Sequence, residues 1–226
     1  MSKRKKSTII NGCIIALLAL ALVFLTEQVL QPGYWVKAAI KAAAFIGAIV
    51  IYTFHSGKKF LDVINLHKPK KIGILILCIL VFFVGIGVLF FLLRNQIDLS
   101  SIKESLMTKE RLTKKNCLFV FVYIICVNSF LEEAFFRGFL ARMIPNKWVG
   151  AIISALLFSV YHIGIVGTWF NVFIFALCII GLALVGLFLQ WLSGKFKTIA
   201  ASWMVHASAN VAINVIGALL IFEVLS

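Results

Sequence analysis

The chain has 226 residues, of which 62% are hydrophobic and only 13% are charged, and its mean hydropathy is +1.07. A soluble domain of this length needs more charged surface, so the composition excludes an ordinary water-soluble fold. The formal charge of +14 raises nucleic acid as a partner, but the basic residues lie in short groups between apolar runs, such as Lys3–Lys6 and Lys68–Lys71. That arrangement is typical of the loops of a membrane protein and speaks against nucleic-acid binding.

Apolar runs follow one another along the whole chain. A membrane helix needs about 20 apolar residues, and the runs that approach or exceed this length are Thr8–Leu30, Tyr34–Phe54, Ile72–Leu93, Cys117–Met143, Trp148–Val166, Trp169–Leu192 and Thr198–Val224. The first run continues past Ala19-Leu20-Ala21, which loosely resembles a signal-peptide cleavage site, and this length favours a membrane anchor. We therefore predict an all-α polytopic transmembrane helix bundle with about seven spans, within a range of six to eight.

The connections between these runs indicate the topology. The basic head up to Lys6, the Lys58–Lys71 loop, the Arg137–Lys147 segment and the Lys195–Lys197 loop are alternate connections, so they share one side of the membrane. Basic loops concentrate on the cytoplasmic side, and we expect a cytoplasmic N-terminus. The chain carries no organellar targeting signal, which suits a bacterial plasma membrane. The Arg94–Asn116 loop falls on the outer side, where we expect an amphipathic segment at the membrane surface.

Two lysines lie near the start of the second run. Lys37 and Lys41 are four residues apart, so both project from one face of the helix. A lysine this close to the end of a span can extend its side chain to the polar headgroups. We interpret both as snorkelling residues.

Few ionisable or amide side chains lie deep in the predicted spans. Three separate runs carry Glu132, Glu133, Arg137, His162, His206 and Asn210, with Asn214 one helical turn further. A charged side chain in the middle of a membrane helix costs about 2.5–3.5 kcal/mol on insertion scales, so such a group usually has a function or a partner. We therefore expect these side chains to face one another inside the bundle.

The spacing in the fourth run predicts different roles for its two carboxylates. Glu133 and Arg137 are four residues apart and can form an ion pair on one helix face. Glu132 lies about 100° around the helix from Glu133 and is left free to react. Such a carboxylate and an imidazole in a dry pocket can polarise a water molecule, while a second imidazole and a carboxamide stabilise an oxyanion. In the alternative, Glu132, His162 and His206 bind a divalent metal such as zinc, whose water is the nucleophile.

Three short motifs resemble those of one family of intramembrane proteases. Glu132–Gly138 reads Glu-Glu-Ala-Phe-Phe-Arg-Gly, Phe158–His162 reads Phe-Ser-Val-Tyr-His, and His206–Asn210 reads His-Ala-Ser-Ala-Asn. They are similar to Glu-Glu-x-x-x-Arg, Phe-x-x-x-His and His-x-x-x-Asn of the CPBP (CAAX protease and bacteriocin-processing, or Abi) family, which includes the Ras-converting CAAX prenyl endopeptidase. The resemblance covers a catalytic core at residues 117–224, whereas residues 1–93 match only as variable N-terminal spans. Residues 1–226 are expected to form a single membrane domain.

The resemblance implies an intramembrane endopeptidase that cleaves a membrane-associated peptide or protein. It assigns these roles: Glu132 as general base, His162 as a holder of the attacking water, His206 and Asn210 at the oxyanion, and Glu133 and Arg137 in support. Family members are commonly named metalloproteases, yet a metal-free glutamate mechanism is also proposed, and both stay open. The family also suggests a role in bacteriocin immunity or in the processing of secreted peptides such as pheromone precursors.

Two functions of other classes also stay open. A membrane partner or regulator could retain the protease fold and its motifs without catalysis. A small transporter or proton relay could use Glu132 and Glu133, although the chain shows no internal repeat of the kind that many transporters have. Variants of Glu132 or His206 that insert normally and keep full biological activity would favour a non-catalytic role.

Overall fold

The computed structural model describes residues 3–70, 72–166 and 172–225, and these residues are helical with turns and contain no β-strand. This confirms the predicted all-α class. The elements in chain order are α1 (Lys3–Leu25), η1 (Thr26–Leu30), α2 (Tyr34–Ser56), α3 (Phe60–Ile64), α4 (Ile72–Leu93), η2 (Arg94–Gln96), α5 (Leu99–Thr108), α6 (Cys117–Tyr123), η3 (Ile124–Asn128), α7 (Ser129–Glu133), η4 (Ala134–Leu140), α8 (Ala141–Met143), α9 (Lys147–Val166), α10 (Val172–Phe196) and α11 (Ile199–Ile221).

The predicted count of membrane spans is confirmed. Within the described part of the chain, 6 helices are long and apolar enough to cross a membrane, and Lys147–Ile163 of α9 is a shorter apolar stretch. The run predicted to end at Leu192 continues as α10 to Phe196. Lys195 lies over the ring of Trp191 one turn earlier, with 4.6 Å between Nζ and the ring centroid, and this contact supports the extra turn. Residues 169–171, the predicted start of this run, lie outside the described residues.

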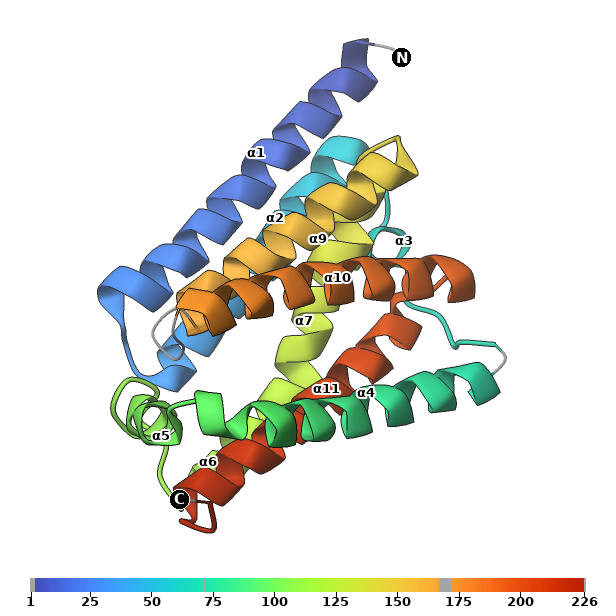
Figure 1. The fold of residues 1–226 in the computed structure, drawn as a ribbon. Coiled ribbons are helices and arrows are strands. Elements are labelled where there is room, and N and C mark those ends of the chain that lie inside the picture. Colours follow the sequence, from blue (N-terminus) through green and yellow to red (C-terminus); the bar gives the residue numbers. More distant parts are fainter. Residues whose placement is uncertain (1–2, 71, 167–171, 226) are drawn as a thin grey trace.

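One continuous helical rod from Cys117 to Met143 runs through the middle of the molecule (Figure 1). It comprises α6, η3, α7, η4 and α8, and it packs against α2, α9 and α11. Helix α1 lies along α2, helix α4 lies along α11, and α10 packs against α9 and α11. Side chains in the middle of the rod are therefore enclosed by helices from both halves of the chain.

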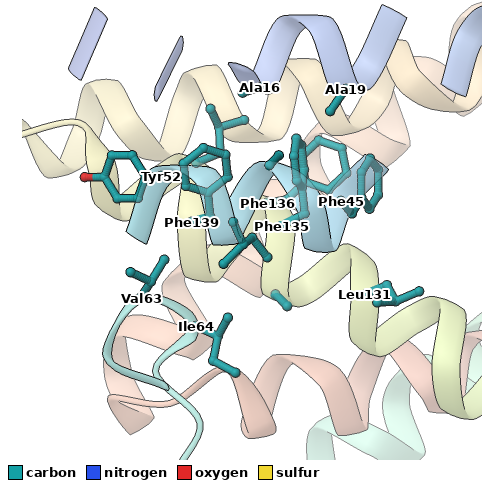
Figure 2. Close-up of a cluster of buried hydrophobic side chains, with 14 of the residues drawn as sticks. Ala16, Ala19, Phe45, Tyr52, Val63, Ile64, Leu131, Phe135, Phe136 and Phe139 are labelled. Carbon is teal, nitrogen blue, oxygen red and sulfur yellow. The ribbon is translucent and has the colours of Figure 1, made fainter. Parts of the chain in front are cut away.

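Aromatic rings fill the contact between the rod and the N-terminal spans (Figure 2). Phe135 and Phe136 of η4 are 0% exposed, and Phe45 of α2 stacks on Phe135 with 4.1 Å between the ring centroids. Ala16 and Ala19 belong to the same buried cluster, and their small side chains allow α1 to approach closely. The N-terminal spans therefore share one core with the rod.

The outer faces of the helices are apolar. All of α4 is described, and Leu75 alone is buried in it, whereas Leu77, Leu80 and Val81 are each more than half exposed. An exposed apolar surface of this extent is stable only where lipid or protein covers it. The chain is accordingly a multi-pass membrane protein.

Connections with basic residues meet at one end of the bundle. The side chain of Asn65, in the connection after α2, donates to the carbonyl of Lys197 at 3.0 Å, which joins it to the turn between α10 and α11. Arg142 of α8 donates through Nη1 to the carbonyl of Asp62 at 3.2 Å. Three of the basic connections that share one predicted side are thus hydrogen-bonded to one another.

The loop between α4 and the rod contains the helical segment that was expected there. Asp98 caps α5, because its carboxylate accepts the Ser101 N–H at 3.0 Å. This bond, together with one from the Ser101 hydroxyl, lowers the pKa of the Asp98 carboxyl from its ordinary value. Leu106 of α5 packs against a buried cluster that includes Phe121 and Ile221, so the helix is anchored to the rod and to α11.

Gly138 lies where the rod and α3 approach each other closely. A Cβ atom at this position would lie 2.8 Å from Ile64 Cα and 3.0 Å from the Ile64 carbonyl oxygen. We expect Gly138→Ala to lower the free energy of unfolding by about 1–3 kcal/mol, the usual cost of overpacking, because backbone has to move. Gly85→Ala is the control, since nothing lies within 4 Å of its Cβ position. Thermal unfolding in detergent measures both, and equal melting temperatures for the two variants would contradict the close approach.

Candidate active site

The rod departs from α-helical geometry on both sides of α7. The segments η3 and η4 are π-helical, with wider turns than an α-helix. At the start of α7, the Ser129 hydroxyl donates to the carbonyl of Ile125 in η3 and accepts the indole N–H of Trp203 at 3.0 Å, which ties the rod to α11. Such π-helical turns occur frequently at functional sites. Here they flank the helical turn that carries Glu132 and Glu133.

Glu132 is 2% exposed and its two carboxylate oxygens have different surroundings. Oε1 accepts hydrogen bonds from Asn128 Nδ2 at 2.8 Å and from the Tyr161 hydroxyl at 3.1 Å, and it lies 3.9 Å from Lys41 Nζ. Oε2 lies 3.7 Å from Nε2 of His206. One oxygen thus accepts hydrogen bonds from two elements and faces an ammonium group from a third, while the other oxygen faces an imidazole.

Glu133 and Arg137 form the ion pair that their spacing predicts. Both are 0% exposed, and Nη1 faces Oε1 at 3.1 Å without the geometry of a hydrogen bond. The guanidinium lies over the Phe158 ring at 4.1 Å and donates to the Gly186 carbonyl at 3.4 Å. Glu133 Oε2 and Arg137 Nε have no hydrogen-bond partner among the described residues. The mutual attraction of the two charges must therefore offset their desolvation.

His206 lies between the two carboxylates. Its Nδ1 is 2.9 Å from Glu133 Oε1, and its Nε2 is 3.7 Å from Glu132 Oε2. A carboxylate can only accept, so Nδ1 carries the proton in this contact and the ring orientation is fixed. The two glutamates lie about 100° apart on the helix and were expected to have separate roles. They share His206 as a partner, and each contacts a different nitrogen of its ring.

His162 is half-buried on α9, and its Nδ1 donates to the Phe158 carbonyl at 2.7 Å. A neutral His162 then presents Nε2 as a proton acceptor. The Phe158 ring packs against both imidazoles, with centroid distances of 4.5 Å to His162 and 5.8 Å to His206. His162 also lies within electrostatic range of Glu132. The structure thus brings the residues of all three motifs around one phenyl ring.

Asn210 lies one turn beyond His206 on α11 and is half-buried. Its Nδ2 donates a long hydrogen bond of 3.4 Å to the carbonyl of Ile124 in η3. The amide therefore faces the rod one turn away from His206. A bond of this length is weak, and the amide can exchange it for a stronger acceptor.

The interpretation of Lys41 as a snorkelling residue is wrong. Lys41 is 8% exposed, and its Nζ donates to Asn128 Oδ1 at 3.0 Å in addition to facing Glu132. Its ammonium also lies 5.3 Å from the centroid of the Tyr161 ring. The side chain points into the bundle because the rod offers it a carboxylate and an amide, which compensate its charge better than a long reach to the headgroups.

The same correction applies to Lys37. This residue is 5% exposed, and its Nζ contacts Glu27 Oε2 at 2.9 Å and Glu110 Oε1 at 2.8 Å. These contacts link α2 to η1 and to the segment after α5. The two lysines do share one helix face, as their spacing predicts, but that face is turned inward.

Sequence reasoning missed Lys41, Asn128 and Tyr161 as partners of Glu132. Tyr161 occupies one of the variable positions in the Phe-x-x-x-His motif, and Asn128 lies one turn before Glu132 on the same helix. The four-residue spacing of Asn128 and Glu132 is the one signal that could have revealed a contact in advance. Lys41 comes from a distant span and gave no such signal.

The proposed metal ligands Glu132, His162 and His206 do not converge as a metal-binding set. No group of three His, Cys, Asp or Glu side chains in the described ranges is arranged to hold a metal ion. The zinc alternative gains no support from this geometry.

Comparison with known protein families bears on the C-terminal half of the chain. Residues 114–212 match the family model described as type II CAAX prenyl endopeptidase Rce1-like. The match covers all three motifs and confirms the resemblance to CAAX-type membrane proteases. No curated protein and no solved structure matches the chain. The matched segment includes the rod and α9, whereas α1, α2 and α4 lie outside it.

Proposed function

We propose that this protein is an intramembrane endopeptidase that hydrolyses a peptide bond in a membrane-associated peptide or protein. The observation that carries the proposal is the position of His206 between Glu132 and Glu133, at 3.7 Å and 2.9 Å. A buried carboxylate opposite an oriented imidazole is an arrangement that can activate water. The chain then needs no serine or cysteine nucleophile.

The first step is the attack of water on the scissile carbonyl. Glu132 Oε2 accepts one proton of the water, and the water oxygen forms a bond to the carbonyl carbon as the carbonyl π electrons move to oxygen. His162 holds the same water through the acceptor nitrogen Nε2. Oε1 takes no part, because Asn128 and Tyr161 already donate to it.

His206 and Asn210 are proposed to stabilise the oxyanion that this attack creates. For His206 to donate through Nε2 while Nδ1 remains bonded to Glu133, the ring must carry both protons. Both nitrogens of the ring face carboxylate oxygens, which are hydrogen-bond acceptors. In the second step the carbon–nitrogen bond breaks, and Glu132 returns its proton to the leaving amine.

The charge distribution supports an orientation in which the basic end of the bundle faces the cytoplasm. The hydrogen-bonded connections around Asn65, Asp62 and Lys197 lie in or beside the basic loops, which belong on the cytoplasmic side by the positive-inside tendency. We propose a multi-pass protein of the plasma membrane with a cytoplasmic N-terminus. The proposed biological role is bacteriocin immunity or the processing of a secreted peptide.

Hydrolysis can be tested directly with isotopically labelled water. The purified protein in liposomes is incubated with membrane-anchored test peptides in H₂¹⁸O, and products are identified by mass spectrometry. We expect cleavage at an internal bond, with ¹⁸O in the new carboxyl group, because water is the nucleophile. Glu132→Gln is the inactive control.

The assay also separates the other readings. Activity that disappears with a chelator and returns with zinc would replace the metal-free mechanism with the metal mechanism. Wild-type protein that binds the peptides as tightly as Glu132→Gln and cleaves none would support a non-catalytic membrane partner. Uptake of solute or protons into the liposomes without cleavage would support a transporter.

A further inference from the structure

Lys41 is a basic residue that the Rce1-like match does not include, yet its ammonium reaches the candidate active site. We propose that Lys41 is a positioning residue that keeps Glu132 ionised and turns its Oε2 towards the reacting water. This inference rests on the proposed function for its catalytic meaning. The contacts that carry it come from α2, which belongs to the N-terminal spans.

The first contact fixes the orientation of an amide. An ammonium group can only donate, so Lys41 Nζ at 3.0 Å requires the carbonyl oxygen Oδ1 of Asn128 to face it. The Asn128 amide nitrogen is then directed to Glu132 Oε1, where it donates at 2.8 Å. Without Lys41, either orientation of the amide is available, and one of them turns an acceptor towards the carboxylate.

The second effect is selection between the two oxygens of Glu132. Lys41, Asn128 and Tyr161 all approach Oε1, at 3.9, 2.8 and 3.1 Å. An oxygen surrounded in this way is a poor proton acceptor. Oε2, which faces His206, is left as the basic oxygen.

The third effect is compensation of buried charge. The site contains two buried carboxylates, Glu132 and Glu133, and two buried cations, Arg137 and Lys41. Arg137 pairs with Glu133, so among the described residues Lys41 is the lysine or arginine that forms an ion pair with Glu132. Other polar or titratable groups around Glu132 are Asn128 on the rod, Tyr161 and His162 on α9, and His206 on α11. None of these carries a permanent positive charge.

Lys41→Met and Lys41→Gln remove the charge, and Lys41→Gln keeps a hydrogen-bond donor. We expect both to lower kcat with little change in KM and to move the acid limb of the pH–activity profile about 1–3 pH units higher. The sign follows because the ionised carboxylate is the active form, and loss of a nearby cation favours its protonated form. Lys41→Arg should restore most of the wild-type profile.

Lys37→Met is the matched control, because Lys37 lies one turn away on the same face and contacts Glu27 and Glu110 instead of the site. It should lower thermal stability but leave the acid limb unchanged. Asn128→Leu keeps Lys41 but removes the amide that connects it to Glu132. The acid limb of this variant should therefore move in the same direction by a smaller amount. Lys41 variants whose acid limb coincides with that of wild type would overturn the inference, whatever their stability.

A second measurement does not depend on activity. The infrared absorption of a protonated carboxyl group, taken as the difference between each protein and its Glu132→Gln counterpart, follows the protonation of Glu132 directly. We expect this signal to persist to higher pH in Lys41→Met than in wild type. If no peptide is cleaved but the infrared titration moves, the charge coupling stands and the proposed protease function fails. If wild type is active and neither titration moves, the protease function stands and the role of Lys41 is rejected.

Discussion

Glu132→Gln is expected to lower kcat by about 10²–10⁴-fold, the usual contribution of a general base, while the protein still folds. Glutamine has nearly the same shape as glutamate, and its carbonyl oxygen can still accept from Asn128 and Tyr161. It cannot take a proton from water. The rate of peptide cleavage and the melting temperature in detergent should be measured on the same preparation.

Two controls distinguish loss of the base from general damage to the site. Tyr161→Phe removes a donor to Oε1 but no basic group, so it should cost far less activity than Glu132→Gln. Val160→Ala changes the neighbouring residue of α9, which is exposed on the outer face, and should leave kcat unchanged. Glu132→Gln with more than a tenth of wild-type activity would contradict the assignment of the base.

Arg137→Met should give the largest loss of stability among single substitutions in the site. It leaves the Glu133 carboxylate 0% exposed and without the guanidinium that faces it at 3.1 Å. Removing one partner of a buried ion pair costs about 3–5 kcal/mol, a large part of the stability of a typical domain. Thermal or denaturant unfolding in detergent measures the difference from wild type.

Arg142→Met is the matched control, since Arg142 lies five residues further along the same rod and is exposed. Arg142→Met should lower the free energy of unfolding much less than Arg137→Met. The Arg142 guanidinium donates hydrogen bonds to the Asp62 and Val63 carbonyls at the end of the bundle. The double variant Glu133→Gln/Arg137→Met should recover part of the lost stability, because it removes both charges. A double variant less stable than Arg137→Met alone would show that the pair does not act through charge neutralisation.

The bundle was predictable because a membrane helix satisfies its own backbone hydrogen bonds, so its length and apolar composition appear directly in the sequence. The run Cys117–Met143 was predicted with the bounds that the rod has. The pair of Glu133 and Arg137 was predictable for a related reason. Both residues are on one helix, and their spacing alone places them on one face.

Contacts between distant spans were not predictable in the same way. The direction of the Lys41 side chain depends on which face of α2 meets the rod, and one sequence does not contain this information. Lysine near the end of a span is compatible with both snorkelling and an inward ion pair. The π-helical segments were not predicted either, because the composition of these segments fits an α-helix equally well.

The wide turns in η4 determine how the site would respond to a change in chain length. Helix α7 enters the seven-residue segment Ala134–Leu140 from one side, and the aromatic core holds the segment in place. A π-helical segment contains more residues per turn than an α-helix, so a return to α-helical geometry would absorb the loss of one residue there. Glu132 would then keep its direction towards His206. The same loss from a regular α-helix would rotate everything before it by about 100°. A frame-preserving deletion of one codon in this short stretch should therefore spare the active site.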